Sequence, residues 1–407
     1  MSKSILSRPF AATTALALVT GGLLLGAAAP AHAADRTVGA GGTYATIGEA
    51  IAAADPGDVI IVADGAYAES VTLSEAVTLR GATARGAVIT GNVALAAPAR
   101  VSGLTITGSV ILQAGGAGSR IDDNTVQGAS QLISIEAGGS EAQTSLIEGN
   151  TLQNVVVPGG GNANGIFDNG GSWVRIVGNT FVNTPTTPAG SVGVNLASGA
   201  SHVTIEDNSF TNWENALSVL APGSAASTHV DFVGNTVTGT TSSALYIGGN
   251  NVTELVIAGN AISDVARNAI VFTSGYPGDP DAWIAPGGAP LSGVVIEGNA
   301  ISTAQTGLLI DPIAVLADDE AIVSRGNTFS DLDGPAIDNR NTTSITSVDD
   351  IFNGAAVEGE VDVVVTPAAE PAKPQLPATG VDVAAPLGMA ALLALLGTAL
   401  VLRRRTA

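Results

Sequence analysis

The sequence predicts an all-β solenoid, a parallel β-helix in which short strands stack coil upon coil. The first observation is composition: of 407 residues 45% are apolar, only 4% are aromatic and 51 are glycine. Such a composition suits short strands and tight turns better than packed helices. The second observation is a phrase that recurs at intervals of 25 to 39 residues, which is typical of stacked coils.

The recurring phrase reads apolar-x-apolar-x-Gly/Asp-Asn and sits in the segment 59–356. Asparagine tolerates a left-handed backbone, and its amide can bond the same amide one coil away. With about 27 residues per coil, this segment holds about 11 coils. We expect one ladder of eight amides, formed by Asn124, Asn150, Asn179, Asn208, Asn235, Asn260, Asn299 and Asn327.

A second phrase, seen for example in Gly193-Val194-Asn195-Leu196, occurs seven times, six times before a ladder asparagine and once after the last one. Its alternation of apolar and other residues predicts a further strand in each coil. The outward-facing column of these strands is expected to be Phe167, Asn195, Ser218, Tyr246, Val271, Leu309 and Asp338.

The open end of such a stack needs a lid, and residues 34–58 supply one. Thr46 and Glu49 have the spacing of a capping box, so a short helix is expected over 46–54. Pro56-Gly57 ends it.

Residues 1–33 have the pattern of a secretory signal peptide. Lys3 and Arg8 precede an apolar run, and Ala31-His32-Ala33 offers a cleavage site after Ala33. The alternative is an N-terminal membrane anchor, which Gly21 and Gly22 inside the apolar run disfavour.

The segment 376–407 has three parts: a short motif, an apolar stretch over 383–402 that is long enough to span a bilayer, and three closing arginines. This end resembles the LPxTG cell-wall sorting signal of Gram-positive surface proteins. The resemblance implies that a sortase cuts after Thr379 and joins the chain to peptidoglycan, and a permanent single-span transmembrane anchor is the alternative. The motif is Leu376, Pro377, Ala378, Thr379 and Gly380, and residues 357–375 are expected to be a proline-rich linker.

The opening of the body also resembles a family. Tyr44-Ala45-Thr46-Ile47, Pro56-Gly57-Asp58 and Val77-Thr78-Leu79-Arg80-Gly81 are similar to the start of pectin-lyase-like right-handed parallel β-helix proteins. The resemblance covers about residues 37–356 and implies a right-handed helix. It implies no single activity, because the superfamily includes polysaccharide lyases, glycoside hydrolases, esterases and adhesins.

Composition and motifs narrow the function. The net charge of −21 disfavours nucleic acid and anionic polymers as partners. No Cys is present, which excludes disulfides and thiolate metal sites. The Gly-His-Gly and Arg-Ile-Lys motifs of polygalacturonase-type relatives are missing, and the coils hold no lysine to act as the base of a lyase.

An insertion over 274–290 accounts for the longest interval between ladder asparagines. Tyr276 and Trp283 can stack on sugar rings, as can Tyr246 on the outward column. Asp279 and Asp281 can bond hydroxyl groups or hold Ca²⁺, the one cofactor considered. The alternative is a plain surface loop.

Asp311 and Asp338 are expected on one strand column, where with Asp279 they are candidate carboxylates for glycoside hydrolysis. The leading hypothesis is a secreted, wall-anchored β-helix that displays a glycan-binding or adhesin surface. The second is a surface glycoside hydrolase or polysaccharide lyase, and the third is an inert spacer in the wall. The expected partners are a sortase, peptidoglycan and an extracellular glycan, with the membrane contacted only through the C-terminal span.

Overall fold

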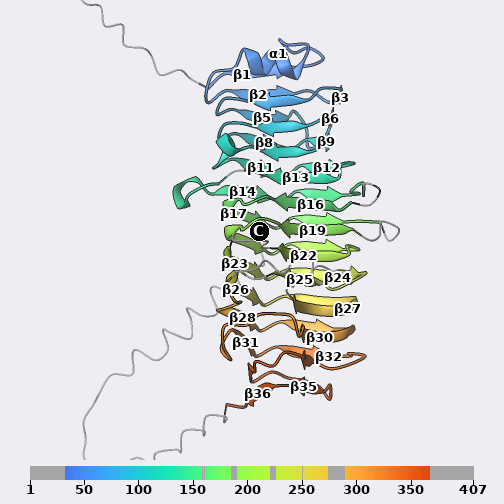
Figure 1. The fold of residues 1–407 in the computed structure, drawn as a ribbon. Coiled ribbons are helices and arrows are strands. Elements are labelled where there is room, and N and C mark those ends of the chain that lie inside the picture. Colours follow the sequence, from blue (N-terminus) through green and yellow to red (C-terminus); the bar gives the residue numbers. More distant parts are fainter. Residues whose placement is uncertain are drawn as a thin grey trace, which may run out of the picture. The chain divides into compact units, whose positions relative to one another are not determined.

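The computed structural model describes residues 33–366, except 137, 158, 160, 185–189, 221–225, 250 and 274–288. Within this part the chain winds into stacked coils, and Figure 1 shows them running from α1 (blue) to β36 (red). Strands of neighbouring coils pair in parallel and form three columns. The predicted parallel β-helix is confirmed.

The first column is a sheet of 14 described strands. Most of them carry the apolar-x-apolar part of the recurring phrase. They are β1 (Asp35–Val38), β2 (Val59–Val62), β5 (Thr78–Gly81), β8 (Arg100–Ser102), β11 (Arg120–Asp122), β14 (Ser145–Glu148), β17 (Ser172–Val177), β20 (Ser201–Glu206), β23 (Ser227–Val233), β26 (Val252–Ala258), β28 (Val294–Glu297), β31 (Ile322–Arg325), β34 (Ile345–Val348) and β36 (Val361–Val364).

The second column follows each ladder turn and consists of short strands. They are β3 (Gly65–Tyr67), β6 (Ala87–Thr90), β9 (Thr105–Thr107), β12 (Thr125–Gln127), β15 (Thr151–Gln153), β18 (Thr180–Val182), β21 (Ser209–Thr211), β24 (Thr236–Thr240), β29 (Ala300–Ser302) and β32 (Thr328–Ser330). The long strand β27 (Ala261–Thr273) runs through this column and the next, which joins the two into one sheet.

The third column carries the second sequence phrase. Its strands are β4 (Val71–Leu73), β7 (Val93–Leu95), β10 (Val110–Leu112), β13 (Gln131–Ile135), β16 (Ala163–Asp168), β19 (Ser191–Leu196), β22 (Asn215–Leu220), β25 (Leu245–Gly248), the second half of β27, β30 (Ala304–Ile310), β33 (Ile337–Asn339) and β35 (Val357–Gly359). Two short 3₁₀ helices lie between strands, η1 (Ala114–Gly116) and η2 (Glu141–Gln143).

The helix α1 (Ile47–Ala52) lies at the N-terminal end of the stack (Figure 1). Thr46 accepts a hydrogen bond from the Glu49 amide and the Glu49 carboxylate accepts one from the Thr46 amide, so the predicted capping box is confirmed. Ile47 and Ala50 are buried against the first coils. The helix thereby covers apolar side chains that an open coil end exposes.

The interior is one continuous aliphatic core lined by side chains from all three columns. In its middle the rings of Phe181 and Phe210 stack with centroids 4.4 Å apart, and Trp213 meets Phe181 edge-on at 6.2 Å. Each coil therefore buries its side chains against the next one, as a solenoid requires.

The eight predicted asparagines form one ladder. The Nδ2 group of each of the first seven donates to Oδ1 of the next at 2.8–3.2 Å. The ladder ends at Asp350, whose Oδ1 accepts from Nδ2 of Asn327 at 3.0 Å. A carboxylate has no proton to pass on, so the chain of amides stops there. The residue before each asparagine is a Gly or Asp with φ between 53° and 66°, which explains the Gly/Asp-Asn phrase.

Three features differ from prediction. Twelve first-column strands, β2 to β34, start within 59–356, against about 11 expected, because the register partners Val59, Thr78, Arg100 and Arg120 lie only 19 to 22 residues apart. The stack also continues past residue 356, since β35 and β36 lie in the segment predicted as linker and pair with β33 and β34. The predicted cap segment 34–58 adds a strand, β1, to the first column.

No helix within residues 33–366, leaving aside the undescribed positions, has the length and apolarity to cross a membrane. The predicted span 383–402 lies outside the described residues.

Candidate functional site

The outer side of the third column, which we call the third-column face, gathers the predicted outward residues. Their register partners run through successive strands from β16 to β33, and Glu358 of β35 continues the line. The predicted order is therefore confirmed. Along the helix axis the column reads Phe167, Asn195, Ser218, Tyr246, Val271, Leu309, Asp338 and Glu358, so after Phe167 its character changes from polar through apolar to acidic.

An upper groove of about 220 Å³ crosses β19, β22 and β25 on this face. Asn195, Glu214, Ser218 and Tyr246 are among its lining residues. The Nδ2 group of Asn195 donates to Oδ1 of Asn164 at 3.1 Å, but Asn195 Oδ1 is buried without a partner in the described part of the chain. Glu214 is half-buried and accepts a hydrogen bond from the Gly190 amide. The groove thus presents one carboxylate among amide and hydroxyl groups, and no basic side chain lines it.

An apolar patch follows the upper groove. It consists of Tyr246, Val271 and Leu309, with Leu220 packed against them. A side chain at Gly248 would collide with the Tyr246 ring, since an added Cβ would lie 2.5 Å from Cε1. Gly248 therefore makes room for this ring to lie along its own strand. Tyr246 is the one predicted ligand-binding residue within the described part of the chain.

A lower groove of about 500 Å³ lies beyond the patch, across β27, β30, β33 and β35. Asp333, Asp338, Arg340 and Glu358 are among its lining residues. Oδ2 of Asp338 accepts from Nε of Arg340 at 2.8 Å, and this hydrogen bond raises the pKa of the guanidinium above its usual value. Asp338 and Glu358 are register partners on neighbouring coils. Three carboxyl groups, those of Asp333, Asp338 and Glu358, therefore share the groove with one guanidinium.

Asp311 and Asp338, predicted on one strand column, lie on successive coils of the third column but are not register partners. The register partner of Asp338 is Leu309, and Asp311 follows two residues later, level with Arg340. Oδ1 of Asp311 accepts from the Ile313 amide at 3.1 Å and so shapes a local turn. The carboxylate beside Asp338 is instead Glu358, which the sequence placed in a linker.

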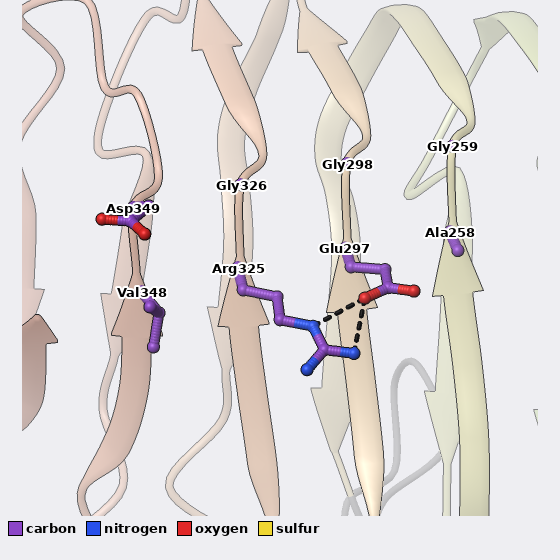
Figure 2. Close-up of a pocket in the computed structure, with 8 residues that line it drawn as sticks. All are labelled: Ala258, Gly259, Glu297, Gly298, Arg325, Gly326, Val348 and Asp349. Atoms are coloured by element: carbon purple, nitrogen blue, oxygen red, sulfur yellow. Dashed lines mark hydrogen bonds and ion pairs between the residues drawn. The ribbon is translucent and has the colours of Figure 1, made fainter. Parts of the chain in front are cut away.

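A further groove, of about 520 Å³, lies where the first column meets the ladder turns (Figure 2). Figure 2 shows its floor of Gly259, Gly298 and Gly326 and the pair that crosses it. Nε of Arg325 lies 2.6 Å from Oε2 of Glu297. The glycines have φ of 60° to 62° because the turn requires it, and the two charges neutralise each other. This groove is explained by the turn itself.

The other predicted site residues lie outside the described residues. They are Tyr276, Asp279, Asp281 and Trp283 of the insertion and Leu376, Pro377, Ala378, Thr379 and Gly380 of the sorting motif. Among the described residues, no three His, Asp or Glu side chains are grouped so as to hold a metal ion. Ala33, the predicted cleavage residue, is described and exposed.

Comparison with known proteins identifies the fold. Residues 109–278 match the family model for the right handed beta helix region. The catalytic domain of Agl-KA is similar in structure, with a TM-score of 0.58 and 13% identity over 78% of this chain and 64% of that one. This chain therefore spans less than two thirds of that domain. No curated protein sequence matches the chain.

Two other solved structures have lower TM-scores. The catalytic unit of a GH87 α-1,3-glucanase from Streptomyces thermodiastaticus has a TM-score of 0.49 and 17% identity, over 78% of this chain and 63% of that one. An alginate lyase from Paenibacillus has a TM-score of 0.42 and 14% identity, over 81% and 99%. The protein thus has a right-handed parallel β-helix fold.

Proposed function

We propose that the protein binds an extracellular polysaccharide along the third-column face. The observation that carries the proposal is the order of this face: a polar groove with one carboxylate, an apolar patch and an acidic groove follow one another along the coils. Sugars have hydroxyl edges and apolar ring faces, and such a surface offers partners to both. Four coil steps separate Ser218 from Asp338. At about 4.8 Å per step they span about 19 Å, enough for several sugar rings.

The charge of the chain and of its grooves restricts the class of glycan that can bind. The chain carries a net charge of −21, and neither groove on this face is lined by a lysine. The one arginine that lines them, Arg340, is already paired with Asp338. A uronate polymer would meet repulsion, so the ligand is a neutral or amine-bearing glycan, or one bridged by cations.

Retention on a panel of insoluble and soluble polysaccharides, with and without Ca²⁺, tests the proposal. We expect at least one glycan to retain the protein and Ser218→Trp, which fills the upper groove, to abolish retention. Thr204→Trp, on the outer side of β20 in the first column, is the matched control and should bind normally. Failure of every glycan to retain the protein would reject the proposal and favour the spacer.

A second candidate function is hydrolysis of the bound glycan, and the specific observation is the register of Asp338 with Glu358. Neighbouring strands lie about 4.8 Å apart, close to the separation of about 5–5.5 Å between the carboxyl groups of retaining glycosidases. The similar Agl-KA structure is itself described as a catalytic domain, which makes the test worthwhile.

Release of reducing ends from each retained glycan tests hydrolysis. Asp338→Asn and Glu358→Gln should each lower the rate by about 100-fold or more, because each carboxyl group would act as nucleophile or as general acid and base. Unchanged release by both variants, or no release by the unmodified protein, would reject hydrolysis by these residues and leave glycan binding as the proposed function.

We further propose that the protein is secreted and attached to the cell wall through the sorting motif. The sequence of the motif, the apolar stretch and the arginines after it support this. Wall fragments released by a muramidase should carry the chain with Thr379 as its last residue, joined to a peptidoglycan amine. Thr379→Ala should leave the chain in the membrane fraction, and equal wall attachment of both forms would contradict the proposal.

A further inference from the structure

Glu214 is the charged group of the upper groove. It is half-buried, its Oε2 accepts from the Gly190 amide, and its own amide donates to the Ser191 carbonyl at 3.1 Å. These contacts fix the carboxylate on the groove wall. No lysine or arginine lines the groove, so the negative charge has no counter-ion there.

One neighbouring amide oxygen also lacks a donor. Asn195 is only 4% exposed, yet its Oδ1 has no partner among the described residues. Its Nδ2 is already used in the bond to Asn164. A carboxylate and an amide oxygen are acceptors, so a ligand satisfies them only by donating. An ammonium group brings three donors and the opposite charge. A hydroxyl group brings one donor, and the carboxylate group of a uronate brings none.

We propose that the upper groove binds an amino sugar whose amine is free and protonated, held by Glu214. This inference rests on the polysaccharide binding proposed above and narrows its ligand to glycans that carry unacetylated amines. The acidic lower groove on the same face extends the favourable potential to further amines of the same polymer.

The test uses three oligosaccharides with the same linkage and length that differ in one substituent: glucosamine, N-acetylglucosamine and glucose. Calorimetry at pH 5.5 with the whole chain after Ala33 should give about tenfold tighter binding of the glucosamine form, because charge-assisted hydrogen bonds are the strong ones. The preference should weaken with added salt. Glu214→Gln should remove the preference, and Glu75→Gln, an exposed carboxylate of an early coil, should keep it.

Each outcome decides. Equal affinity for the three forms overturns the amine inference and leaves the proposed function intact. Binding of none of them, together with no retention on any polysaccharide, overturns both. A preference for the amine that survives Glu214→Gln also overturns the inference, because another residue would then bind the ammonium group.

A separate observation concerns the first described residues. The amide nitrogen of Ala34 donates to Oδ1 of Asp58 at 2.8 Å, and the Val59 amide donates to the Ala34 carbonyl at 2.9 Å. The side chain of Asp58 is only 4% exposed, and Nε of Arg36 lies 2.6 Å from its Oδ2. Ala34 thus forms hydrogen bonds through both its amide and its carbonyl group, whereas Ala33 forms none with the described residues.

We infer that removal of the signal peptide creates an ion pair at this place. When the Ala33–Ala34 peptide bond is hydrolysed, water supplies the hydroxyl of the Ala33 carboxyl group and the Ala34 nitrogen becomes an ammonium. This ammonium stands at hydrogen-bond distance from the buried Asp58 carboxylate, beside Arg36. Processing therefore converts a neutral hydrogen bond into a charge-assisted one that fastens β1 to β2.

The experiment compares two whole chains, one starting at Ala34 and one starting a residue earlier at Ala33. The pH dependence of α-amine acylation reports the amine pKa, which is ordinarily about 7.7–8.0. We expect the Ala34 amine to titrate at least about one unit higher and the Ala33 amine to titrate normally. Asp58→Asn should return the Ala34 amine to its ordinary value.

Sequencing of the secreted protein completes the test, and Ala34 should be its first residue. A different first residue overturns the inference, as does an Ala34 amine that reacts with an ordinary pKa. The chain starting at Ala33 keeps the Asp58 carboxylate, so the comparison holds even where Asp58→Asn disturbs the first coil.

Discussion

The outer sides of the first and third columns are built on the same coils but treat charge differently. On the first-column face, carboxylates stand beside arginines: Asp122 with Arg100 and Arg120, and Glu206 with Arg175. On the third-column face, Glu214 and Glu358 form no ion pair with a described basic residue, and Asp338 has only Arg340. The first face neutralises itself, whereas the second leaves negative charge available to a ligand. An unpaired carboxylate in a groove attracts cationic groups of a ligand, whereas a paired one does not.

The aromatic rings of the first-column face also pair with one another. Trp173, His202 and His229 lie on successive coils with ring centroids 4.1 and 4.5 Å apart. Nε2 of His229 lies 2.7 Å from Oε2 of Glu254, which ends the stack. The rings therefore cover one another's inner faces, although the His229 side chain remains 53% exposed.

The largest expected effect on stability is at the buried carboxylate of the first-column face. The side chain of Asp122 is 1% exposed, and its oxygens accept from Nε and Nη2 of Arg100 at 2.8 and 2.6 Å. Asp122→Ala removes an acceptor of three side-chain hydrogen bonds, two of them from Arg100, and should lower the free energy of unfolding by about 3 kcal/mol. Urea denaturation measures it, and retention on glycans should be unchanged. A loss below about 1 kcal/mol would show that paired charges do not hold this face.

The same residue gives a pH dependence with a definite sign. Burial raises the pKa of Asp122, but the bonds from Arg100 and Ser102 outweigh it, and the pKa lies below its usual value. The stabilisation is therefore complete above the unfolded-state value of about 3.9 and is lost as the pH falls through the lower folded-state value. The cost of Asp122→Ala should shrink accordingly in acid.

The next largest effect on stability is expected in the interior, at a carboxyl group that destabilises the fold instead of stabilising it. Asp168 of β16 points inward, is fully buried, and Oδ2 has no partner among the described residues. Burial raises its pKa to about 6, although the amides of Gly171 and Gly170 oppose this. The folded protein therefore favours the protonated form, and this carboxyl group destabilises it increasingly as the pH rises from about 4 to 6.

Asp168→Asn removes this titration. The stability of the variant relative to the unmodified protein should rise by about 2–3 kcal/mol between pH 4 and pH 7, since one unit of pKa shift corresponds to about 1.4 kcal/mol. Urea denaturation at several pH values measures the difference. A difference that does not change with pH would mean that Asp168 titrates normally.

The sequence predicts the scaffold well because its determinants are local and repeated. A Gly or Asp before Asn fixes the left-handed turn, as at Gly178-Asn179, and every coil repeats the pattern. The third-column face is harder to predict, because residues that lie side by side on it come from different coils. Which residues become neighbours depends on the register between those coils. Loops of unequal length set that register, so the pairing of Asp338 with Glu358 rather than with Asp311 is not readable from spacing. Glu358 is hidden further by its place next to a proline-rich stretch.

The third-column counterpart of Asp122 is Asp338, and the two sharpen the comparison. Asp338 has one partner, Arg340, whose side chain is 58% exposed and can be solvated when the pair is broken. Asp338→Asn should therefore cost about 1 kcal/mol or less in stability. It should nevertheless weaken glycan binding by about tenfold or more, since it removes a charge from the groove. A large loss of stability without a loss of function would make this face a scaffold as well.

The smallest effect is expected at an exposed pair of the first-column face. Nη2 of Arg175 lies 3.2 Å from Oε2 of Glu206, with the side chains 51% and 37% exposed. Solvent screens such a pair, so Glu206→Gln should change the free energy of unfolding by about 0.5 kcal/mol or less. The difference should vanish at 1 M salt, where the screening length is about 3 Å. A loss above about 2 kcal/mol that persists in salt would mean that the ion pairs of this face act together, coil to coil, and that its charges stabilise the stack as a network rather than one by one.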